Sequence, residues 1–579
     1  LLRQNGRPNA DVVNIALDSR QILSRMGDPE SSTSFFKKGL VYGEVQSGKT
    51  GNFNAVINRA IDSGYQLVIV LSGIMEDLRK QTQFRIESDV IGEGTLNKET
   101  ERRGIKGVGH IVRFGPQGDN STRQVLPQTS YKSDFDSGLL DKNFSLNQTS
   151  ILVCKKNDGI LKNLLFSLQD WIPEGQTKLQ LPLLLLDDEA DNASLNNLGP
   201  KGNAYASKIN GHIRALLDLF DQRTYLGYTA TPFANVLQHY TEEPPENWIV
   251  EKGKDRREFS QVHNLFPDDF IVRIQSPINY IGAKKIFETV APPENILGEK
   301  LPVVSVVCDA VEQFPSRVLD DPTSEPKGVE NYQVKSEWDE VVGPFGSYEG
   351  FDTFKEYRKA TKAPSRFDRF PKTLPESLKE AIKAFVISTA IRESRDASTR
   401  DSALYQPHNT MLIHISRFMS WQNRTRDLVA QYVKELSERI DTEAPREEGS
   451  IYLELERVWL KHHEKLVGKV QQYLPEGYRD EYLTDIVFES VCDFVPQAIK
   501  DINVKAINSG TGDSLKYDDK SPQKVIAIGG NRLSRGFTLE GLTVNYFVRT
   551  TNFSDTLFQM GRWFGYRPSY LDCCLLFTT

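Results

Sequence analysis

Cysteine is scarce in this sequence, and long apolar runs are absent. The five cysteines among 579 residues form an odd set with one adjacent pair and no metal-ligand spacing: Cys154, Cys308, Cys492, Cys573 and Cys574. Such a set does not build a disulfide framework, so we expect a reducing compartment, the cytoplasm. No run of about twenty apolar residues exists that could span a membrane, and no signal-peptide pattern opens the chain. We therefore expect no membrane contact.

The chain also lacks an excess of basic residues. Its formal net charge of −7 excludes a protein that coats nucleic acid through bulk electrostatics, but it leaves room for a local basic groove. The eight histidines are scattered, and we expect the adjacent pair His462 and His463 on a solvated helix face. The chain begins with Leu and stops on the apolar pattern Leu575 to Thr579, so we expect a fragment of a longer protein.

Short apolar runs alternate with helical patterns in the first part of the chain. The runs predict buried parallel strands at Leu67 to Leu71, Ile151 to Cys154, Leu183 to Leu186 and Arg223 to Thr229. The segment Ala206 to Phe220 carries apolar residues on one helix face and bridges the last two of these strands. Strands that alternate with helices in this way predict a doubly wound parallel α/β sheet.

A second α/β sheet is predicted in the last part of the chain. Its strands are expected at 411–415, 503–507, 524–529, 542–548 and 571–577, with a helix at 554–564. The length allows two to four domains. We expect a helical lead-in (1–38), a first α/β domain (39–235), an inserted or linking subdomain (236–375) and a second α/β domain (376–579) with a helical insertion at about 420–500.

The segment Gly43 to Thr50 has the pattern G-x-x-x-x-G-K-T of a phosphate-binding loop. It lies between an apolar strand and the helical stretch Gly51 to Ile61, so that the free amides of a helix start face an anion. Lys49 would neutralise the β- and γ-phosphates, and Thr50 would ligate Mg²⁺. The alternative is an ordinary glycine-rich turn. The predicted nucleotide site comprises Gly43, Gln46, Ser47, Gly48, Lys49 and Thr50.

An acidic segment follows the buried run Leu183 to Leu186 and reads Asp187-Asp188-Glu189-Ala190-Asp191. Carboxylates at the carboxyl end of a buried strand lie where open α/β sheets bind ligands. Asp188 would therefore hold Mg²⁺, and Glu189 would orient and deprotonate the attacking water. For Asp187 and Asp191 the alternative is an acidic helix cap.

Two further elements contain hydroxyl and guanidinium groups. Thr229 and Thr231 of a Thr-Ala-Thr-Pro segment end a strand near the acidic pair and can couple the γ-phosphate site to a neighbouring domain.

Arginine also follows the glycines at 529–530 and recurs at Arg562 and Arg567. These two arginines are candidate arginine fingers, because guanidinium contacts phosphate oxygens in a planar, bidentate way. The alternative is that they cap a helix and pair with surface acids.

The order of these segments, with Arg535-Gly536 and Gln559 to Arg562 (Q-x-G-R) last, resembles that of superfamily 2 helicases and translocases. The chain is also similar to the Z-one domain family, proposed endonucleases attached to a helicase-type ATPase in prokaryotic defence and restriction-like gene clusters. The similar segments are Gly43 to Thr50, Asp187 to Asp191, Gly227 to Asn235, Leu265 to Pro267, Ser534 to Leu542 and Gln559 to Arg567. One departure leaves the choice of arginine finger open: Arg567 lies five residues beyond Arg562, and helicases usually have three.

The resemblance implies a fold and an activity. The fold would be a superfamily 2 helicase core of two RecA-like domains that close around ATP and Mg²⁺. The activity would be an ATP-driven motor on DNA, with RNA as the alternative, in antiviral defence or restriction. Gly536 and Gln559 would join the nucleotide site. Nucleic acid would meet Ser72, Gly73, Arg79, Gln81, Ser416, Arg417 and Arg535, of which each is equally well an ordinary surface residue.

Two other functions remain open at this point. One is an ATP-gated DNA-binding switch that recruits a nuclease without translocating. The other is a nuclease with a cutting centre in this chain or in its continuation, although the nearest match, Glu325-Pro326-Lys327 after Asp320-Asp321, is typical of a loop. The protein partners expected from the resemblance are a nuclease or a GHKL-type ATPase.

Overall fold

The computed structural model of the chain falls into two compact units, Leu1–Ile278 and Asn279–Thr579. Each unit is described by itself. The described residues are 8–45, 47–91, 124–136, 148–195, 207–237, 247–277, 280–287, 301–314, 370–402, 404–416, 418–474, 478–508, 515, 517, 521–530, 539–549, 557, 560–563, 565 and 567–579.

The first unit contains a seven-stranded sheet in the order β3-β4-β2-β5-β6-β1-β9, and all of its strand pairs are parallel. The strands are β1 (Phe35–Tyr42), β2 (Leu67–Ser72), β3 (Gln124–Pro127), β4 (Gln148–Lys155), β5 (Leu183–Asp188), β6 (Gln222–Thr229) and β9 (Phe270–Arg273). The hairpin β7 (Asn247–Lys252) and β8 (Asp255–Ser260) forms a separate two-stranded sheet. Among these strands β3, β7, β8 and β9 were not predicted.

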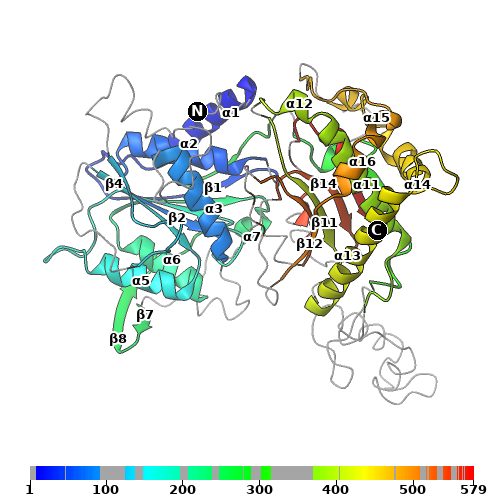
Figure 1. The fold of residues 1–579 in the computed structure, drawn as a ribbon. Helices are drawn as coiled ribbons and strands as arrows, with labels where there is room; N and C mark the ends of the chain where they lie inside the picture. Colours follow the sequence, from blue (N-terminus) through cyan, green and yellow to red (C-terminus); the bar gives the residue numbers. More distant parts are fainter. Residues whose placement is uncertain are drawn as a thin grey trace, which may run out of the picture. The chain divides into compact units, whose positions relative to one another are not determined.

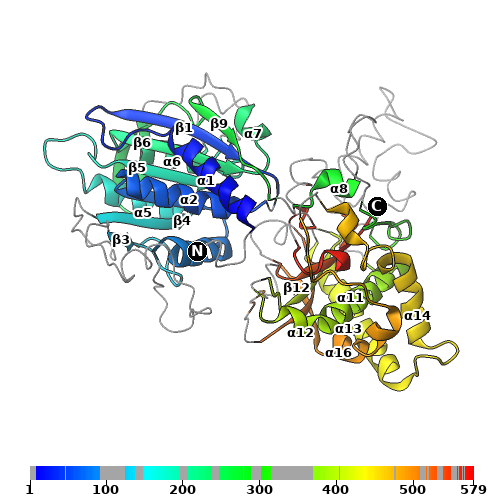
Figure 2. The same cartoon turned by 90° about the horizontal axis from the view of Figure 1, so that it is seen from above.

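Helices cover both faces of this sheet. They are α1 (Asn9–Leu23), α2 (Lys49–Ser63), α3 (Glu76–Ile86), α5 (Asp158–Gln169), α6 (Lys208–Asp218) and α7 (Phe233–Val236), with a π-helical turn at Glu87–Ile91. Side chains of β2 alternate between two cores, since Leu67, Ile69 and Leu71 pack with α5 and α6, whereas Val68 and Val70 pack with α1 and α2. Figure 1 shows α5 and α6 side by side, and Figure 2 shows α1 along α2. The predicted doubly wound sheet is confirmed.

The second unit contains a six-stranded parallel sheet in the order β10-β15-β14-β11-β13-β12. Its strands are β10 (Val304–Val306), β11 (Asn409–His414), β12 (Ile502–Ile507), β13 (Lys524–Gly529), β14 (Leu542–Phe547) and β15 (Leu575–Thr578). The predicted second parallel sheet is therefore confirmed. The strand predicted at 571–577 begins later, because Leu571–Cys573 forms a 3₁₀ turn. Most of the helix predicted at 554–564 lies outside the described residues.

The helices of the second unit are α8 (Ala283–Phe287), α11 (Glu376–Ser394), α12 (Asp396–Thr399), α13 (Met419–Thr442), α14 (Ile451–Val458), α15 (Phe488–Cys492) and α16 (Val495–Ile499). A π-helical turn (Trp459–His463) and a 3₁₀ turn (Val470–Tyr473) complete them. Helix α11 packs on β14, and α13 packs on β12 and β13. Within the described ranges, none of the helices is both long and apolar enough for a bilayer crossing.

The predicted domain boundaries stay predictions, because much of 236–375 lies outside the described residues. Two strands from this stretch nevertheless belong to the main sheets. Strand β9 pairs with β1 in the first unit, and β10 pairs with β15 in the second.

The expectation that His462 and His463 lie on a solvated face is wrong. Their exposed fractions are 7% and 0%. His463 Nε2 lies 3.0 Å from Ser388 Oγ, and His462 Nε2 lies 2.5 Å from Glu380 Oε1. The charged residues around the pair in the sequence suggested an exposed helix, but this face packs on α11.

We predict that acid destabilises the second unit through its neutral buried histidines. Burial first, and then the neighbouring His462, lower the pKa of His463 to about 3. The pKa of His414 also falls to about 3, through burial first and then through Arg549 and Arg562. Unfolding lets each imidazole take up a proton below about pH 6.5, so the unfolding free energy should fall by up to about 1.4 kcal/mol per pH unit and histidine.

Denaturant unfolding between pH 7.5 and 5.5 measures this dependence. In His463→Gln, the unfolding free energy should depend less steeply on pH, by the contribution of about one proton, because glutamine takes up no proton on unfolding. The matched control is His263→Gln, at an exposed position in the first unit, which should leave the slope for the second unit unchanged. An unaltered slope in His463→Gln would contradict the prediction.

Candidate functional site

The predicted phosphate loop joins β1 to α2. Gly48 is the N-cap of α2 and has φ +85°, a left-handed conformation that glycine adopts without strain. Gly43 donates its N–H to the Thr229 carbonyl (3.2 Å), which ties the loop to the end of β6. A Cβ atom on Gly43 would lie 2.6 Å from Ile274 Cγ1, so only glycine fits without a shift. The conformation of Gly48 and the close approach at Gly43 both favour glycine in this loop, and the role of the two residues toward a phosphate stays a prediction. Gln46 lies outside the described residues.

Lys49 begins α2 and lies beside the acidic segment. Its Nζ donates to the carbonyl oxygens of Gly43 (3.4 Å) and Glu44 (3.0 Å). Burial lowers the pKa of Lys49, and the charges of Asp188, Asp191 and Glu189 oppose that shift. The ammonium is therefore held close to several carboxylates at a cost in solvation. A phosphate group would relieve that cost, because it would supply negative charge directly at the amine.

Two hydroxyl groups complete the loop. Ser47 is buried, and its Oγ has no hydrogen-bond partner among the described atoms. A buried hydroxyl without a partner is costly, so this atom fits a phosphate oxygen as its missing acceptor. Thr50 Oγ1 accepts a hydrogen bond from Arg85 Nη1 of α3 (2.9 Å). A hydroxyl oxygen has a second lone pair, which fits the oxygen ligand that Mg²⁺ prefers.

Asp187, the first carboxylate of the acidic segment, is paired within the core of the first unit. Asp187 is fully buried; its Oδ1 lies 2.7 Å from Lys156 Nζ, and its Oδ2 accepts a hydrogen bond from Tyr225 (2.7 Å). Asp187 therefore does not cap a helix, and its charge is neutralised where β5 ends.

Asp188 and Glu189 remain at the end of β5. The pKa of Asp188 rises to about 6 through burial and repulsion by Glu189, while Lys156 and Lys49 oppose the rise. Glu189 has φ +53°, and its Oε2 would lie 3.1 Å from a Cβ atom on Gly73. Two carboxylates thus crowd the strand end beside Lys49, an arrangement that a divalent cation stabilises.

Asp191 connects the acidic segment to the end of β6. Its Oδ1 accepts a hydrogen bond from Thr229 Oγ1 (2.7 Å), and its Oδ2 accepts one from Thr231 Oγ1 (2.8 Å). Thr231 also donates its N–H to Thr229 Oγ1 (2.9 Å). The helix-cap alternative for Asp191 is not seen, because residues 191–195 form a turn. The two threonines are thus joined to the acidic pair through one carboxylate.

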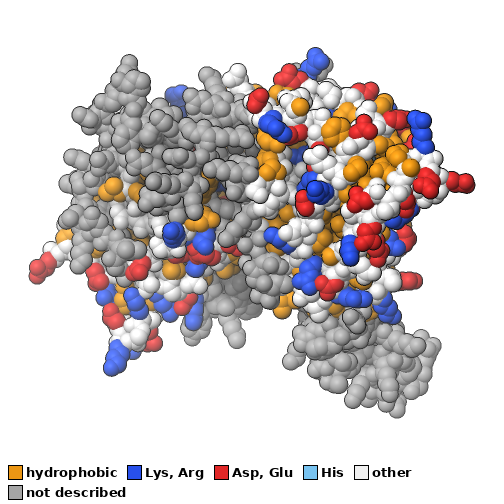
Figure 3. All heavy atoms as spheres, viewed as in Figure 1, with side chains coloured by type: hydrophobic (Ala, Val, Ile, Leu, Met, Phe, Trp, Pro, Cys, Tyr) orange, Lys and Arg blue, Asp and Glu red, His pale blue; other side chains and the backbone are white. Residues whose placement is uncertain are grey.

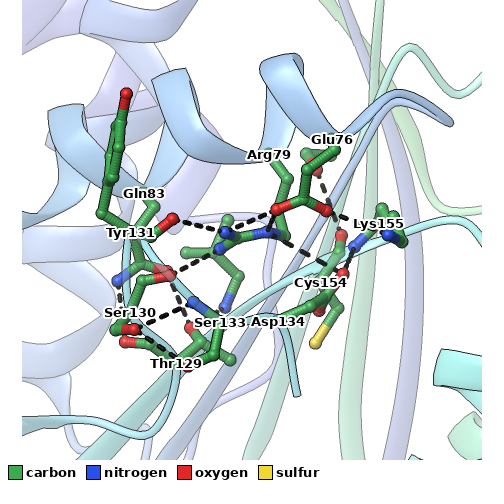
Figure 4. Close-up of polar contacts among 12 residues, drawn as sticks. Glu76, Arg79, Gln83, Thr129, Ser130, Tyr131, Ser133, Asp134, Cys154 and Lys155 are labelled. Carbon is green, nitrogen blue, oxygen red and sulfur yellow. Dashed lines mark hydrogen bonds and ion pairs between the residues drawn. The ribbon is translucent and has the colours of Figure 1, made fainter.

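Two predicted nucleic-acid contacts are wrong for the side chains concerned. Arg79 has no exposed surface; it donates hydrogen bonds to Glu76 Oε1, the Ser130 carbonyl and the Tyr131 carbonyl (2.9 Å each), as Figure 4 shows. Ser72 is also fully buried, and its Oγ donates to the Cys154 carbonyl (3.2 Å). Both side chains fasten α3 or β2 to neighbouring elements.

The other predicted nucleic-acid contacts stay predictions. Gly73 lies next to the Glu189 carboxylate, and Gln81 is half-buried on α3. Ser416 is 8% exposed, and its Oγ accepts a hydrogen bond from the Phe418 N–H (3.2 Å). The remaining two, Arg417 and Arg535, lie outside the described residues. On the face drawn in Figure 3, Lys and Arg side chains are interspersed with Asp and Glu side chains.

The candidate arginine fingers belong to the second unit. Arg567 Nη2 donates to the Arg562 carbonyl (2.9 Å). Arg567 also lines a small, mostly apolar cavity with Trp563, Leu571 and Cys574. Their role toward a nucleotide stays a prediction; Gly536 and Gln559 lie outside the described residues.

Two residues of the site were not predicted: Lys156, which pairs with Asp187, and Arg85, which reaches Thr50. Lys156 follows β4, a strand that is not adjacent to β5 in the sheet. The sequence offered one signal for it, a lysine pair directly after an apolar strand. No comparable signal marked Arg85.

Three solved structures match most of the chain at low identity. The DNA-bound ATP-dependent Type ISP restriction-modification enzyme LlaBIII is 10% identical over 97% of this chain and 27% of its own length (TM-score 0.36). A point variant of Dbp5 from S. cerevisiae, bound to RNA and ADP BeF3, is 10% identical over 100% and 88% (TM-score 0.34). The Hef helicase domain of Pyrococcus furiosus is 11% identical over 97% and 94% (TM-score 0.31). The chain thus spans 27% of the restriction-modification enzyme.

No curated protein matches the chain. A family model matches residues 377–579, which include most of α11 and every described strand of the second sheet except β10. The resemblance seen in the sequence is confirmed for this region. Residues 377–579 are thus similar to the Z1 domain, whose model they match.

Proposed function

We propose that this chain is an ATP-hydrolysing motor of the helicase or translocase type that acts on DNA. One observation carries the proposal: Lys49, the pair Asp188 and Glu189, and the Asp191–Thr229–Thr231 cluster all lie where β1, β5 and β6 end. Open α/β sheets bind ligands at this edge. A phosphate loop, a metal-binding carboxylate and a general base are the parts that nucleotide hydrolysis requires.

In the proposed reaction, a water molecule attacks the γ-phosphorus of ATP. The new P–O bond forms as the bond between the γ-phosphorus and the bridging oxygen breaks, and ADP and phosphate leave. Glu189 orients the water and takes its proton. Lys49, with the amides at the start of α2 and the Ser47 hydroxyl, holds the β- and γ-phosphate oxygens.

Thr50 and Asp188 would hold Mg²⁺. The ion would neutralise charge that develops on the phosphate oxygens. The raised pKa of Asp188 supports this assignment, because burial and the Glu189 charge leave the carboxylate in need of a cation. Arg85 of α3 would then contact a metal ligand, because it donates a hydrogen bond to Thr50 Oγ1. A shift of α3 would therefore move a group that touches the site.

The second unit would supply the remaining parts. Arg562 or Arg567 would act as the arginine finger, with Gly536 and Gln559 near the nucleotide. Gly73, Gln81, Ser416, Arg417 and Arg535 would position a strand of DNA, or alternatively RNA, through its phosphates. The setting would be a prokaryotic antiviral or restriction system in the cytoplasm, with a nuclease or GHKL-type ATPase as partner.

The second candidate is an ATP-gated DNA-binding switch that does not translocate. The network between Asp191 and the two threonines supports it equally, because such a network senses the γ-phosphate whether or not the protein moves. A nuclease centre in this chain has less support. Among the described residues, no group of three or more His, Cys, Asp or Glu side chains could hold a metal ion. Glu325, Pro326 and Lys327 lie outside them, as do Asp320 and Asp321.

We predict that hydrolysis depends on Lys49 and Glu189 in different ways. Lys49→Ala should weaken nucleotide binding, because the phosphates lose their point charge. Glu189→Gln should bind ATP as the wild type does and lose at least about 100-fold in turnover, because the water loses its base. Fluorescent-nucleotide binding and phosphate release measure the two effects. The matched control is Glu44→Gln, an exposed carboxylate of the loop, and turnover by Glu189→Gln equal to wild type would refute the assignment.

We also predict that DNA stimulates the ATPase and that added salt abolishes the stimulation steeply. The acidic chain has to bind DNA through few local phosphate contacts, and each contact releases counterions. Rates should be measured on duplexes of increasing length at two salt concentrations. A motor gains rate with length, whereas a switch saturates on short DNA. Equal rates with and without DNA or RNA at low salt would exclude the motor.

A further inference from the structure

Lys156 is a fully buried lysine whose ammonium is satisfied by three oxygen atoms. Its Nζ lies 2.7 Å from Asp187 Oδ1, 2.7 Å from the Glu189 carbonyl oxygen and 3.1 Å from the Asn192 carbonyl oxygen. The side chains of Lys156 and Asp187 both have an exposed fraction of 0%. Burial of an ammonium is costly, and such a group persists only where it is paired and hydrogen-bonded.

The position of Lys156 in the sheet makes this contact long-range. The residue directly follows β4, whereas the acidic segment follows β5, and β2 lies between these strands. The Lys156 N–H donates to the Gly73 carbonyl just beyond β2 (3.3 Å). One residue therefore ties together the carboxyl ends of three neighbouring strands.

The backbone that Lys156 holds is the strained part of the site. Glu189 has φ +53°, a left-handed conformation that is strained for a residue with a side chain. Its carbonyl accepts hydrogen bonds from Lys156 Nζ (2.7 Å) and from the Asn192 N–H (2.9 Å). The next residue, Ala190, donates its N–H to the Tyr228 carbonyl (3.0 Å). These bonds fix the conformation from which the Glu189 carboxylate extends over Gly73.

Lys156 also makes the first of the three consecutive acidic residues, Asp187, differ from the other two, because it neutralises the charge of Asp187. Together with Tyr225 it satisfies Asp187, whose carboxylate is thereby removed from the site. Asp188 and Glu189 then remain available for the Mg²⁺ ion and the attacking water of the proposed reaction. The two functions, fixing a carbonyl and neutralising Asp187, come from the same ammonium.

We propose that Lys156 is a positioning residue for the hydrolytic step, which sets the direction of the Glu189 carboxylate toward the attacking water. This proposal rests on the proposed ATPase function. It predicts a loss of turnover without a matching loss of nucleotide affinity, because the side-chain contacts of Lys156 are with the acidic segment and not with the phosphate loop.

The adjacent Lys155 provides a matched control. Its Nζ pairs with Glu76 Oε2 (2.9 Å), and its side chain is 26% exposed, on the side of α3 (Figure 4). Lys155→Met removes the same charge one residue away without touching the acidic segment. It should leave turnover and nucleotide affinity unchanged.

The test compares Lys156→Met, Asp187→Asn and the double variant Lys156→Met/Asp187→Asn in the full chain. Lys156→Met alone leaves Asp187 buried without a cation and should lower the melting temperature markedly. The double variant removes both charges and should recover much of that loss. Its turnover should still fall at least about tenfold, because Glu189 has lost the donor that fixes it, while its affinity for ATP with Mg²⁺ stays near wild type.

Two outcomes would overturn the proposal: wild-type turnover in the double variant, or a loss of nucleotide affinity as large as the loss of turnover. Hydrogen exchange of the Ala190 and Asn192 amides tests the positioning without any hydrolysis. Both amides should exchange faster in the double variant than in Lys155→Met, and equal exchange would count against the proposal. If the wild type does not hydrolyse ATP, the proposed function fails, and the exchange result still decides whether Lys156 holds this segment.

Discussion

The parallel register of the first sheet is the constraint on which the site depends. Strand β6 pairs in parallel with both β1 and β5, so Tyr42, Thr229 and Asp188 reach the same edge. A parallel sheet cannot place these strand ends apart without losing its ladder of hydrogen bonds. Residues that are far apart in sequence, such as Lys49 and Asp188, therefore act on each other's pKa. The chemistry of the site follows from the strand order.

Buried charge in this protein occurs in different settings, and two of them bear on the site. Arg79 and Lys156 are fully buried and have close oxygen partners; Arg395 forms a similar buried pair with Asp572 in the second unit. Lys49 and Asp188 differ, since burial pushes both pKa values toward the neutral form. Charges of the first kind persist because they are paired and hydrogen-bonded, whereas a strand end that holds a shifted lysine beside a shifted carboxylate fits a ligand site.

The sequence predicted the strands that form the centre of each sheet, because strands buried on both faces are nearly continuous apolar runs. Strands β2 and β5 are of this type. Strand β9 has only four residues, which alternate between buried and exposed, so an edge strand of this kind has no such run. The loop motif was predictable because its chemistry is local. The burial of Arg79 was not, since it depends on how residues 129–134 fold over α3.

Helix α3 shows why the sequence did not predict the role of Arg79. Its sequence is polar, with Glu76, Lys80 and Arg85 among its charged residues, and the family resemblance placed two of its residues, Arg79 and Gln81, among the nucleic-acid contacts. Near its start, however, Arg79 binds the carbonyls of Ser130 and Tyr131. Near its end, Arg85 binds the Thr50 hydroxyl of the phosphate loop. The two arginines therefore fasten α3 at both ends, to residues 130–131 on one side and to the phosphate loop on the other.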